Sequence, residues 1–289
     1  MQIVDYSGIA IAGIFSQSAR GNITEDFMRH IILNSLRMYN VKYRDKYGRM
    51  VLAVDSGSWR KKYYPEYKAS RKKNRDSSPL DWDMIFGIIN TVRDEIIEHM
   101  PYSVVGAPHA EADDVIATLV ENTQEFGSYE PVMIISADKD FIQLQKYDNV
   151  TQFSPMTKKL VTDSNPHRYL CEHIFRGDSG DGVPNVLSED RVFVDGGRQK
   201  PLSAKKIDEW YAALKKGNLR DVMPDDVYRN YSRNSRVIDL SCIPDEVVQK
   251  INEAYASAPA KSNSKVLNYL ISKRCNMLVD CAEEFFTYK

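Results

Sequence analysis

Short hydrophobic runs alternate, in the first half of the chain, with longer segments whose hydrophobic positions recur every three or four residues. The runs cover residues 2–5, 50–55 and 131–138, with a weaker fourth run at 102–106. Nearly continuous Val- and Ile-rich runs of this length are typical of strands buried on both faces of a parallel sheet. The helical periodicity covers 25–39, 82–99 and 113–123. This alternation predicts an α/β fold with a central, mainly parallel sheet flanked by helices.

The pattern changes after about residue 165, where strand-like runs become rare and helical segments with Gly, Pro and Asp interruptions take over. We therefore predict an α/β core over 1–170 and a smaller, mainly helical region over 171–289. The sequence Asp195-Gly196-Gly197 predicts a loop or hairpin tip within the second region.

Acidic residues follow the predicted strands. Asp5, Asp55 and Asp138 end three of the hydrophobic runs, and Asp140 follows directly. Taken singly, each has an ordinary interpretation as a helix N-cap or turn residue. Together they would meet at the carboxyl edge of one sheet, where ligands of open parallel sheets bind.

Glu111 and Asp113, at the start of a predicted helix, would join the same edge. So many anions repel one another strongly unless cations are bound among them. Oxygen ligands favour magnesium, or manganese in its place, and two such ions about 3.5–4 Å apart support phosphodiester cleavage. For Asp114, a metal role and a charge that complements the helix dipole are equally good interpretations.

Residues 59–75 are strongly basic, with a single acid, Glu66, and three interleaved tyrosines. A solvated charge run is the simpler interpretation of the cations alone. The tyrosines favour a nucleic-acid surface, because aromatic rings stack on bases while cations bind phosphates. We therefore predict nucleic-acid contacts from this stretch by Arg60, Lys61, Lys62, Tyr67, Lys68, Arg71, Lys72 and Lys73.

A glycine-rich acidic loop, Gly177-Asp178-Ser179-Gly180-Asp181-Gly182-Val183-Pro184, lies in the second region. The simpler interpretation of this loop is a tight turn without a ligand. Glycines also let backbone groups approach a phosphate or an ion closely.

Charge and cysteine content indicate the class of ligand and the cellular compartment of the protein. The formal net charge is −1, yet the cations are concentrated in one stretch, which suggests a nucleic-acid ligand. The first residues lack the pattern of a signal peptide, and no apolar run approaches the roughly 20 residues of a membrane span. We expect a soluble cytoplasmic protein whose four cysteines, without zinc-ligand spacing, are reduced: Cys171, Cys242, Cys275 and Cys281.

Six motifs, in order along residues 4–184, resemble those of the 5′-nuclease superfamily, which includes flap endonucleases, the 5′-nuclease domain of bacterial DNA polymerases and phage 5′-exonucleases. The resemblance is strongest to the ribonuclease H group of T-even-type bacteriophages. The motifs are Val-Asp-Tyr-Ser (4–7), Val-Asp-Ser-Gly (54–57), Trp-Arg-Lys-Lys with Tyr-Lys-Ala-Ser-Arg (59–62, 67–71), Glu-Ala-Asp-Asp (111–114), Ser-Ala-Asp-Lys-Asp-Phe (136–141) and Gly-Asp-Ser-Gly-Asp-Gly-Val-Pro (177–184).

The resemblance implies roles for particular residues. A basic arch at about 57–83 would carry Lys68 and Arg71 to the scissile phosphate. One metal would be bound by Asp5, Asp55, Glu111, Asp113 and Asp138, and a second by Asp140, Asp181 and Asp178. The 177–184 turn would form a helix–three-turn–helix element that grips duplex backbone, with an associated monovalent cation. Its contacts would come from Gly177, Gly180, Gly182 and Val183, with Lys205 and Lys206 from the helix that follows.

The implied activity is 5′ to 3′ removal of RNA primers and short DNA from duplexes, with cleavage of 5′ flaps, during lagging-strand replication. The substrates would be DNA and RNA–DNA hybrids in the cytoplasm of an infected bacterium, with a phage single-strand binding protein or sliding clamp as partner. The alternatives are a catalytically inactive nucleic-acid binding protein of the same fold and a small-molecule magnesium phosphatase. The first gains nothing from anions that face phosphate, and the second leaves residues 59–75 without a role.

Overall fold

The computed structural model describes residues 1–17, 23–125, 129–258 and 262–287, apart from the side chains of Lys73 and Asn74. The predicted phosphate contact of Lys73 therefore lies outside the described residues. The chain divides into two compact units. The first comprises 1–57, 81–162 and 245–289, and the second comprises 58–80 and 163–244.

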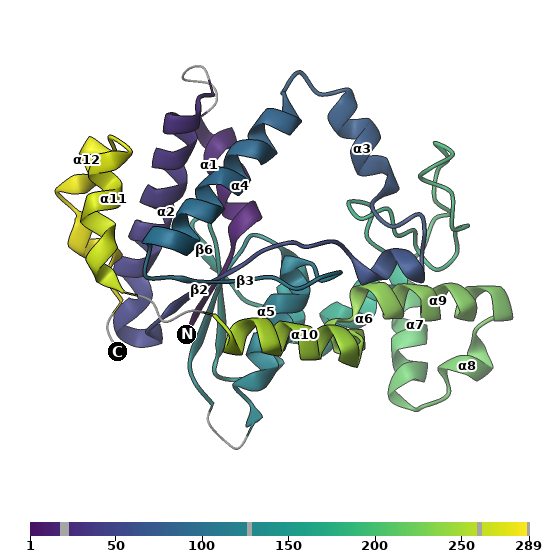
Figure 1. Cartoon of the computed structure of the whole chain (residues 1–289). Coiled ribbons are helices and arrows are strands. Elements are labelled where there is room, and N and C mark those ends of the chain that lie inside the picture. Colours follow the sequence, from purple (N-terminus) through teal and green to yellow (C-terminus); the bar gives the residue numbers. More distant parts are fainter. Residues whose placement is uncertain (18–22, 126–128, 259–261, 288–289) are drawn as a thin grey trace. The chain divides into compact units, whose positions relative to one another are not determined.

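A six-stranded sheet forms the centre of the first unit (Figure 1). Its order is β3-β2-β1-β4-β5-β6, in which all neighbours are parallel except β5 and β6. The strands are β1 (Gln2–Asp5), β2 (Met50–Ala53), β3 (Ser103–Val105), β4 (Val132–Ile135), β5 (Val150–Ser154) and β6 (Lys159–Val161). Every residue of β2 and β4 is buried, as their unbroken apolar runs predict. The predicted α/β fold is confirmed.

The strand order reverses between β1 and β4. The connections from β1 to β2 and from β2 to β3 run in one direction along the sheet, and the connection from β3 to β4 returns across them. Because such crossovers are right-handed, the intervening helices lie on opposite faces of the sheet. The first two connections contain α1 (Tyr6–Gln17), α2 (Glu25–Tyr47) and α4 (Trp82–His99), and the return contains α5 (Ala112–Asn122).

Two features of this unit differ from the predicted elements. Helix α2 continues to Tyr47, eight residues beyond the predicted end at Tyr39, because its polar later turns still bury Asn40, Tyr43 and Tyr47. Strands β5 and β6 were not predicted, since their sequences, VTQFS and KLV, carry few consecutive hydrophobic residues.

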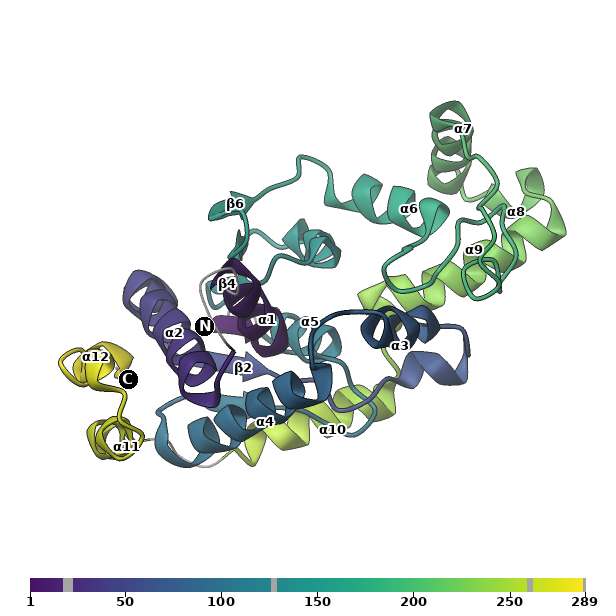
Figure 2. The same cartoon turned by 90° about the horizontal axis from the view of Figure 1, so that it is seen from above.

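The last 45 residues belong with the sheet, whereas the sequence suggested a helical region from 171 to the end. Helix α10 (Asp245–Ala256) packs on α5, where Asn122 Nδ2 donates to Asn252 Oδ1 at 2.8 Å. Helices α11 (Val266–Ser272) and α12 (Asn276–Val279) lie beside α2 (Figures 1 and 2). The buried Asn40 side chain donates to the backbone oxygens of Glu284 and Phe286, which fixes the C-terminal segment on α2.

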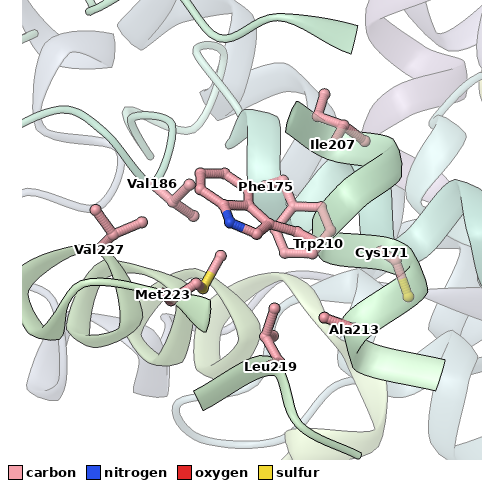
Figure 3. Close-up of a cluster of buried hydrophobic side chains, with 9 residues drawn as sticks. All are labelled: Cys171, Phe175, Val186, Ile207, Trp210, Ala213, Leu219, Met223 and Val227. Carbon is pink, nitrogen blue, oxygen red and sulfur yellow. The ribbon is translucent and has the colours of Figure 1, made fainter. Parts of the chain in front are cut away.

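The second unit is mainly helical and has its own hydrophobic core (Figure 3). Its helices are α3 (Ala69–Asp76), α6 (Pro166–Arg176), α7 (Ala204–Lys215), α8 (Leu219–Val222) and α9 (Asp225–Ile238). Phe175 and Trp210 face each other in this core with ring centroids 5.6 Å apart. No helix in the described part of either unit is long and apolar enough to cross a membrane.

A buried ion-pair network connects α2, α4 and α11 in the first unit. Glu95, 9% exposed, accepts from Arg29 Nε at 2.8 Å and from the Tyr269 hydroxyl at 2.7 Å, and it pairs with Lys273 at 2.5 Å. Burial by itself would raise the pKa of Glu95, but Arg29, Lys273 and Tyr269 outweigh it and lower this pKa to about 2. The network therefore stabilises the fold only while Glu95 is ionised.

We expect Glu95→Gln to lower the free energy of unfolding at neutral pH by about 2 kcal/mol, because it removes the buried anion that Arg29 and Lys273 share, while Arg29 keeps its pairs with Glu25 and Asp26. The carboxyl pKa is lower in the folded chain, so its contribution is complete above about pH 5 and is lost as the pH falls toward 2. Denaturant unfolding between these pH values should show a shallower loss for the variant than for the parent. Glu98→Gln, an exposed change on the same helix, should behave like the parent; parallel curves for parent and Glu95→Gln would contradict the assignment.

Candidate metal centre and nucleic-acid surface

Asp5 and Asp138 are connected through a serine at the point where the strand order reverses. Asp5 ends β1, where the preceding residue, Val4, pairs with Ile135, and Ser136 follows Ile135 at the end of β4. The Ser136 hydroxyl donates to Asp5 Oδ2 at 3.0 Å and accepts from the Asp138 backbone N–H at 3.1 Å. The buried Gln152 side chain donates to the backbone oxygens of Ser136 and Asp138, which fixes the loop between them. The two predicted acids therefore lie at the edge where doubly wound sheets bind ligands.

A glycine in the first turn of α1 makes room for the Asp5 carboxylate. The Gly8 backbone N–H donates to Asp5 Oδ1 at 2.9 Å. A Cβ added at Gly8 would lie 2.3 Å from Asp5 Oδ2, far inside contact distance. Only glycine at position 8 therefore leaves the carboxylate where the structure has it.

Asp55 is held against the start of α5. Its Oδ1 accepts from the backbone N–H of Ala112, at the N-terminus of that helix, at 3.0 Å. The loop after Asp55 is fixed to the loop before α5 by two backbone hydrogen bonds, Ser56 N–H to Ala110 and His109 N–H to Ser56, both 2.8 Å. Strand β2 pairs with β1 in a register that places Ala53 opposite Asp5. Asp55 is thus brought to the same sheet edge as Asp5.

The other predicted acids of this unit lie on the segments that these hydrogen bonds hold at the sheet edge. Glu111 is the N-cap of α5 and is buried, and Asp113 is half-buried in the first turn. Asp140 begins the short helix after Asp138, where its backbone N–H donates to Asp138 Oδ1 at 2.9 Å. Asp114 accepts from the Glu111 backbone N–H at 2.9 Å as a buried capping side chain, which favours the helix-terminus interpretation of this residue.

In the second unit, the glycine-acid loop is a tight turn closed by its own backbone. Gly177 and Gly182 both have positive φ, and a Cβ at Gly177 would lie 2.3 Å from the Val183 oxygen. The Asp178 carboxylate accepts from the Gly180 N–H at 2.7 Å, and its backbone oxygen accepts from Val183 N–H at 2.7 Å. The buried Asn234 side chain of α9 donates to Ile174 and Pro184 oxygens and so fixes the turn to α6.

Asp181, in this turn, is surrounded by groups from the basic stretch. Its carboxylate accepts from the Tyr67 hydroxyl at 2.7 Å, lies 3.5 Å from Lys68 Nζ and pairs with Arg71. The Asp181 backbone oxygen accepts from the Lys68 N–H at 2.7 Å, and Lys68 has a positive φ of 58°. Burial would raise the pKa of Asp181, but Lys68 and Arg71 outweigh it, so this pKa is lowered. These cations offset its charge, and its predicted role as a metal ligand stays a prediction.

The basic, aromatic stretch is more deeply folded than its sequence suggested. Arg60 is 2% exposed and donates to the Val237 oxygen, and Tyr64 and Tyr67 are core residues at 2% and 3% exposure. Base stacking by Tyr67 and phosphate contact by Arg60 therefore do not fit this structure: the tyrosine ring fills a hydrophobic cluster, and the guanidinium satisfies a helix-end carbonyl. The exposed basic and tyrosine members, among the described side chains, are Lys61, Lys62, Tyr63, Arg71, Lys72 and Arg75. Lys205 and Lys206, at the start of α7, are exposed as well.

Sequence reasoning missed the residues that position the acids. Ser136 and Gly8 lie inside or beside the quoted motifs, but their value depends on contacts across the sheet and across a helix turn. Asn234 and Gln152 are buried polar side chains far from any motif. No pattern in their local sequences indicates these roles, because β5, with the sequence VTQFS, mixes polar and apolar residues.

Comparison with known proteins agrees with this geometry. The family model described as 5′-3′ exonuclease, N-terminal resolvase-like domain, matches residues 11–170, and that of the T4 RNase H C-terminal region matches residues 169–285. The chain is 33% identical over 294 residues to ribonuclease H of Enterobacteria phage T4, covering 98% of this chain and 95% of the relative. The chain therefore belongs to the 5′-3′ exonuclease family and is a metal-dependent 5′ nuclease of the phage ribonuclease H type.

Solved structures share the fold at low sequence identity. The bacteriophage T5 D15 protein, co-crystallised with metal ions, matches with a TM-score of 0.61 at 17% identity, over 89% of this chain and 98% of that chain. A complex of a T5 D15 flap endonuclease variant with DNA and metal ions matches over the same shares with a TM-score of 0.57 at 16% identity. Metal ions are thus present in structures of this fold.

We expect Gly8→Ala to impair the metal centre without destabilising the protein. An alanine favours helix α1 by about 1 kcal/mol, yet its Cβ displaces the Asp5 carboxylate. Titration with Mn²⁺ should show binding weakened by about ten- to a hundredfold at an unchanged or higher Tm. Gly87→Ala, at a helical position with open space around the added Cβ, is the matched control and should bind Mn²⁺ like the parent; equal binding by both variants would contradict the role of Gly8.

Proposed function

We propose that Asp5, Asp55, Glu111, Asp113, Asp138 and Asp140 bind two magnesium ions, for which manganese can substitute. The observation that supports this most directly is the pair of connections that gather the acids, Asp5 through Ser136 to Asp138, and Asp55 to the start of α5. The donor set is entirely carboxylate oxygen, which fits hard divalent cations. The space that Gly8 leaves around Asp5 fits a carboxylate kept accessible to a ligand. When bound, the ions supply water activation and charge stabilisation for phosphodiester hydrolysis.

We further propose that Lys68 and Arg71 stabilise the charge that develops on the scissile phosphate. The pairing of both side chains with Asp181 favours this role, because it holds two flexible cations in fixed positions before substrate binds. Tyr67 contributes indirectly, through its hydrogen bond to Asp181. Asp178 and Asp181 remain proposed ligands of the second ion.

The 177–184 turn is proposed to bind duplex backbone through its glycines, with Lys205 and Lys206 of α7 as further phosphate contacts. The predicted contact by Val183 does not fit this structure, because that residue is 1% exposed and its N–H donates to Asp178. A monovalent cation there would have to share oxygens that already accept protein hydrogen bonds. Gly180 accepts from Arg71, Gly182 from Tyr64, and Pro184 from Arg233 and Asn234. The protein's own donors thus support the conformation of the turn.

The proposed substrates are RNA–DNA hybrids and DNA duplexes with a 5′ end or 5′ flap, cleaved 5′ to 3′ to remove primers during lagging-strand replication. The setting is the cytoplasm of an infected bacterium, with a single-strand binding protein or sliding clamp as partner. An inactive binding protein of the same fold is the alternative, and the carboxylates argue against it because anions facing phosphate weaken binding.

Asp138→Asn and Asp113→Asn should abolish turnover while leaving substrate affinity unchanged or slightly stronger. Each removes an anion that binds metal, and asparagine at 138 keeps an oxygen for the Asp140 N–H. The assay follows product release from a 5′-labelled RNA–DNA hybrid and a 5′-flap substrate, side by side, with Mg²⁺ and then Mn²⁺. Parent protein that cleaves neither substrate with either ion would refute the proposed function, and parallel loss of binding and cleavage in the variants would indicate unfolding instead.

Lys68→Ala and Lys72→Ala are expected to separate chemistry from binding. Lys68 is held by Asp181, so its loss should lower the single-turnover rate by roughly a hundredfold. The exposed Lys72 should affect affinity by only a few fold and reduce the salt slope of binding by about one. An unchanged salt slope for Lys72→Ala would identify that lysine as solvated only, and a normal rate for Lys68→Ala would remove it from the catalytic step.

A further inference from the structure

A groove with a lysine-rich rim lies in the first unit, between the later turns of α2 and the face of strands β5 and β6. It encloses about 610 Å³, and we call it the lysine groove. Phe153 of β5 and Leu160 of β6 are Cα partners in the antiparallel ladder and therefore share the face that forms its floor. Leu160 is 54% exposed, so apolar surface remains accessible there. The rim is formed by Lys42, Lys46 and Lys158.

The three lysines make the groove positive. Lys42 Nζ lies 4.0 Å from the centroid of the Phe153 ring, and Lys46 Nζ lies 5.0 Å from that of Tyr47. Among the described residues, none of the three ammonium groups forms an ion pair, and none of the residues that line the groove is an Asp or Glu. Aromatic rings hold two of these cations in place without neutralising them. Their charge is available to an anionic ligand.

The groove adjoins the cavity of the predicted metal centre, and the two share one lining residue. Lys158 lines both the lysine groove and a second cavity of about 860 Å³, and Asp5, Ser136 and Asp138 line that second cavity. The rest of the wall of this second cavity is formed by α1, α2 and the turn of the β5–β6 hairpin. This turn includes Met156, which is 73% exposed. A chain bound at the carboxylates therefore lies next to the lysine groove, with Lys158 between them.

We propose that the lysine groove binds a single-stranded segment of the substrate, with phosphates at Lys42, Lys46 and Lys158 and base surfaces on the exposed apolar floor. This inference rests on the proposed function, since it assigns the occupant from the adjoining nuclease centre. A positively charged groove that follows the phosphates is a common way to hold single-stranded nucleic acid without sequence preference. The exposed Leu160 offers apolar contact to the bases here. An acidic peptide would satisfy the cations as well, but nothing connects a peptide to the carboxylate edge.

The test is equilibrium binding by fluorescence anisotropy in EDTA, with a triple variant, Lys42→Gln/Lys46→Gln/Lys158→Gln. The substrates are one RNA–DNA hybrid without extensions and two forms of it, one with a 5′ and one with a 3′ oligothymidylate extension. We expect the triple variant to lose affinity for at least one extended form by about tenfold or more, with a salt slope shallower by about two, because each lysine releases about 0.7 counterion equivalents. Affinity for the unextended hybrid should change less than twofold.

Lys250→Gln, an exposed change on α10, is the matched control and should bind all three substrates like the parent. Equal loss on the extended and unextended hybrids, or no loss on any, would overturn the proposal. Ultraviolet cross-linking of the extension to the parent gives a second measurement, in which peptides from 42–47 or 153–160 should be labelled. Labelling confined to other peptides would also overturn it. Because no divalent ion is present, these outcomes are independent of whether the protein cleaves its substrate.

Discussion

Mutual repulsion among carboxylates is the constraint on which the first unit depends. Parallel strands β1, β2 and β4 end at one edge of the sheet, so acids placed after them cannot separate without breaking the sheet. Polar groups around the acids fix their positions by donating hydrogen bonds to the carboxylates. Ser136 donates to Asp5, Ala112 donates to Asp55, and Gly8 leaves the space that a side chain would otherwise fill. The divalent cations that we propose to bind here would relieve the repulsion that remains, which would tie the chemistry of the site to the topology of the sheet.

In the second unit, the charge of a single acid is offset by the protein's own cations. Asp181 is neutralised by the protein's own cations, Lys68 and Arg71, and by the hydroxyl of Tyr67. The same contacts connect the basic stretch to the glycine-rich turn, whose positive-φ glycines leave the close approach possible. Lys68 and Arg71, which we propose as the catalytic cations, need little further ordering when substrate arrives, because their pairing with Asp181 already restricts their positions.

The sequence predicted those features that depend on local pattern. Unbroken Val and Ile runs identified four strands, and acids at their ends identified the sheet edge, because the direction of parallel strands determines where their last residues meet. Features that depend on distant partners were not predictable. The burial of Arg60 and Tyr67 follows from α6 and α9, which occupy a different part of the sequence. The attachment of the C-terminal segment to α2 depends on Asn40, a polar residue that by pattern alone belongs on a surface. Strand β5 was missed because three of its five residues are polar, among them Gln152, which supports Ser136 and Asp138.

The central claim is that the acids at the carboxyl edge of the sheet bind the divalent metal of a 5′ nuclease. Anomalous scattering from crystals grown with Mn²⁺ tests it most directly, because it locates the ion independently of activity. The account predicts a peak at about 2.0–2.4 Å from carboxylate oxygens of Asp5 and Asp138. Peaks found only at other carboxylates, with this edge free of manganese at saturating concentration, would contradict it.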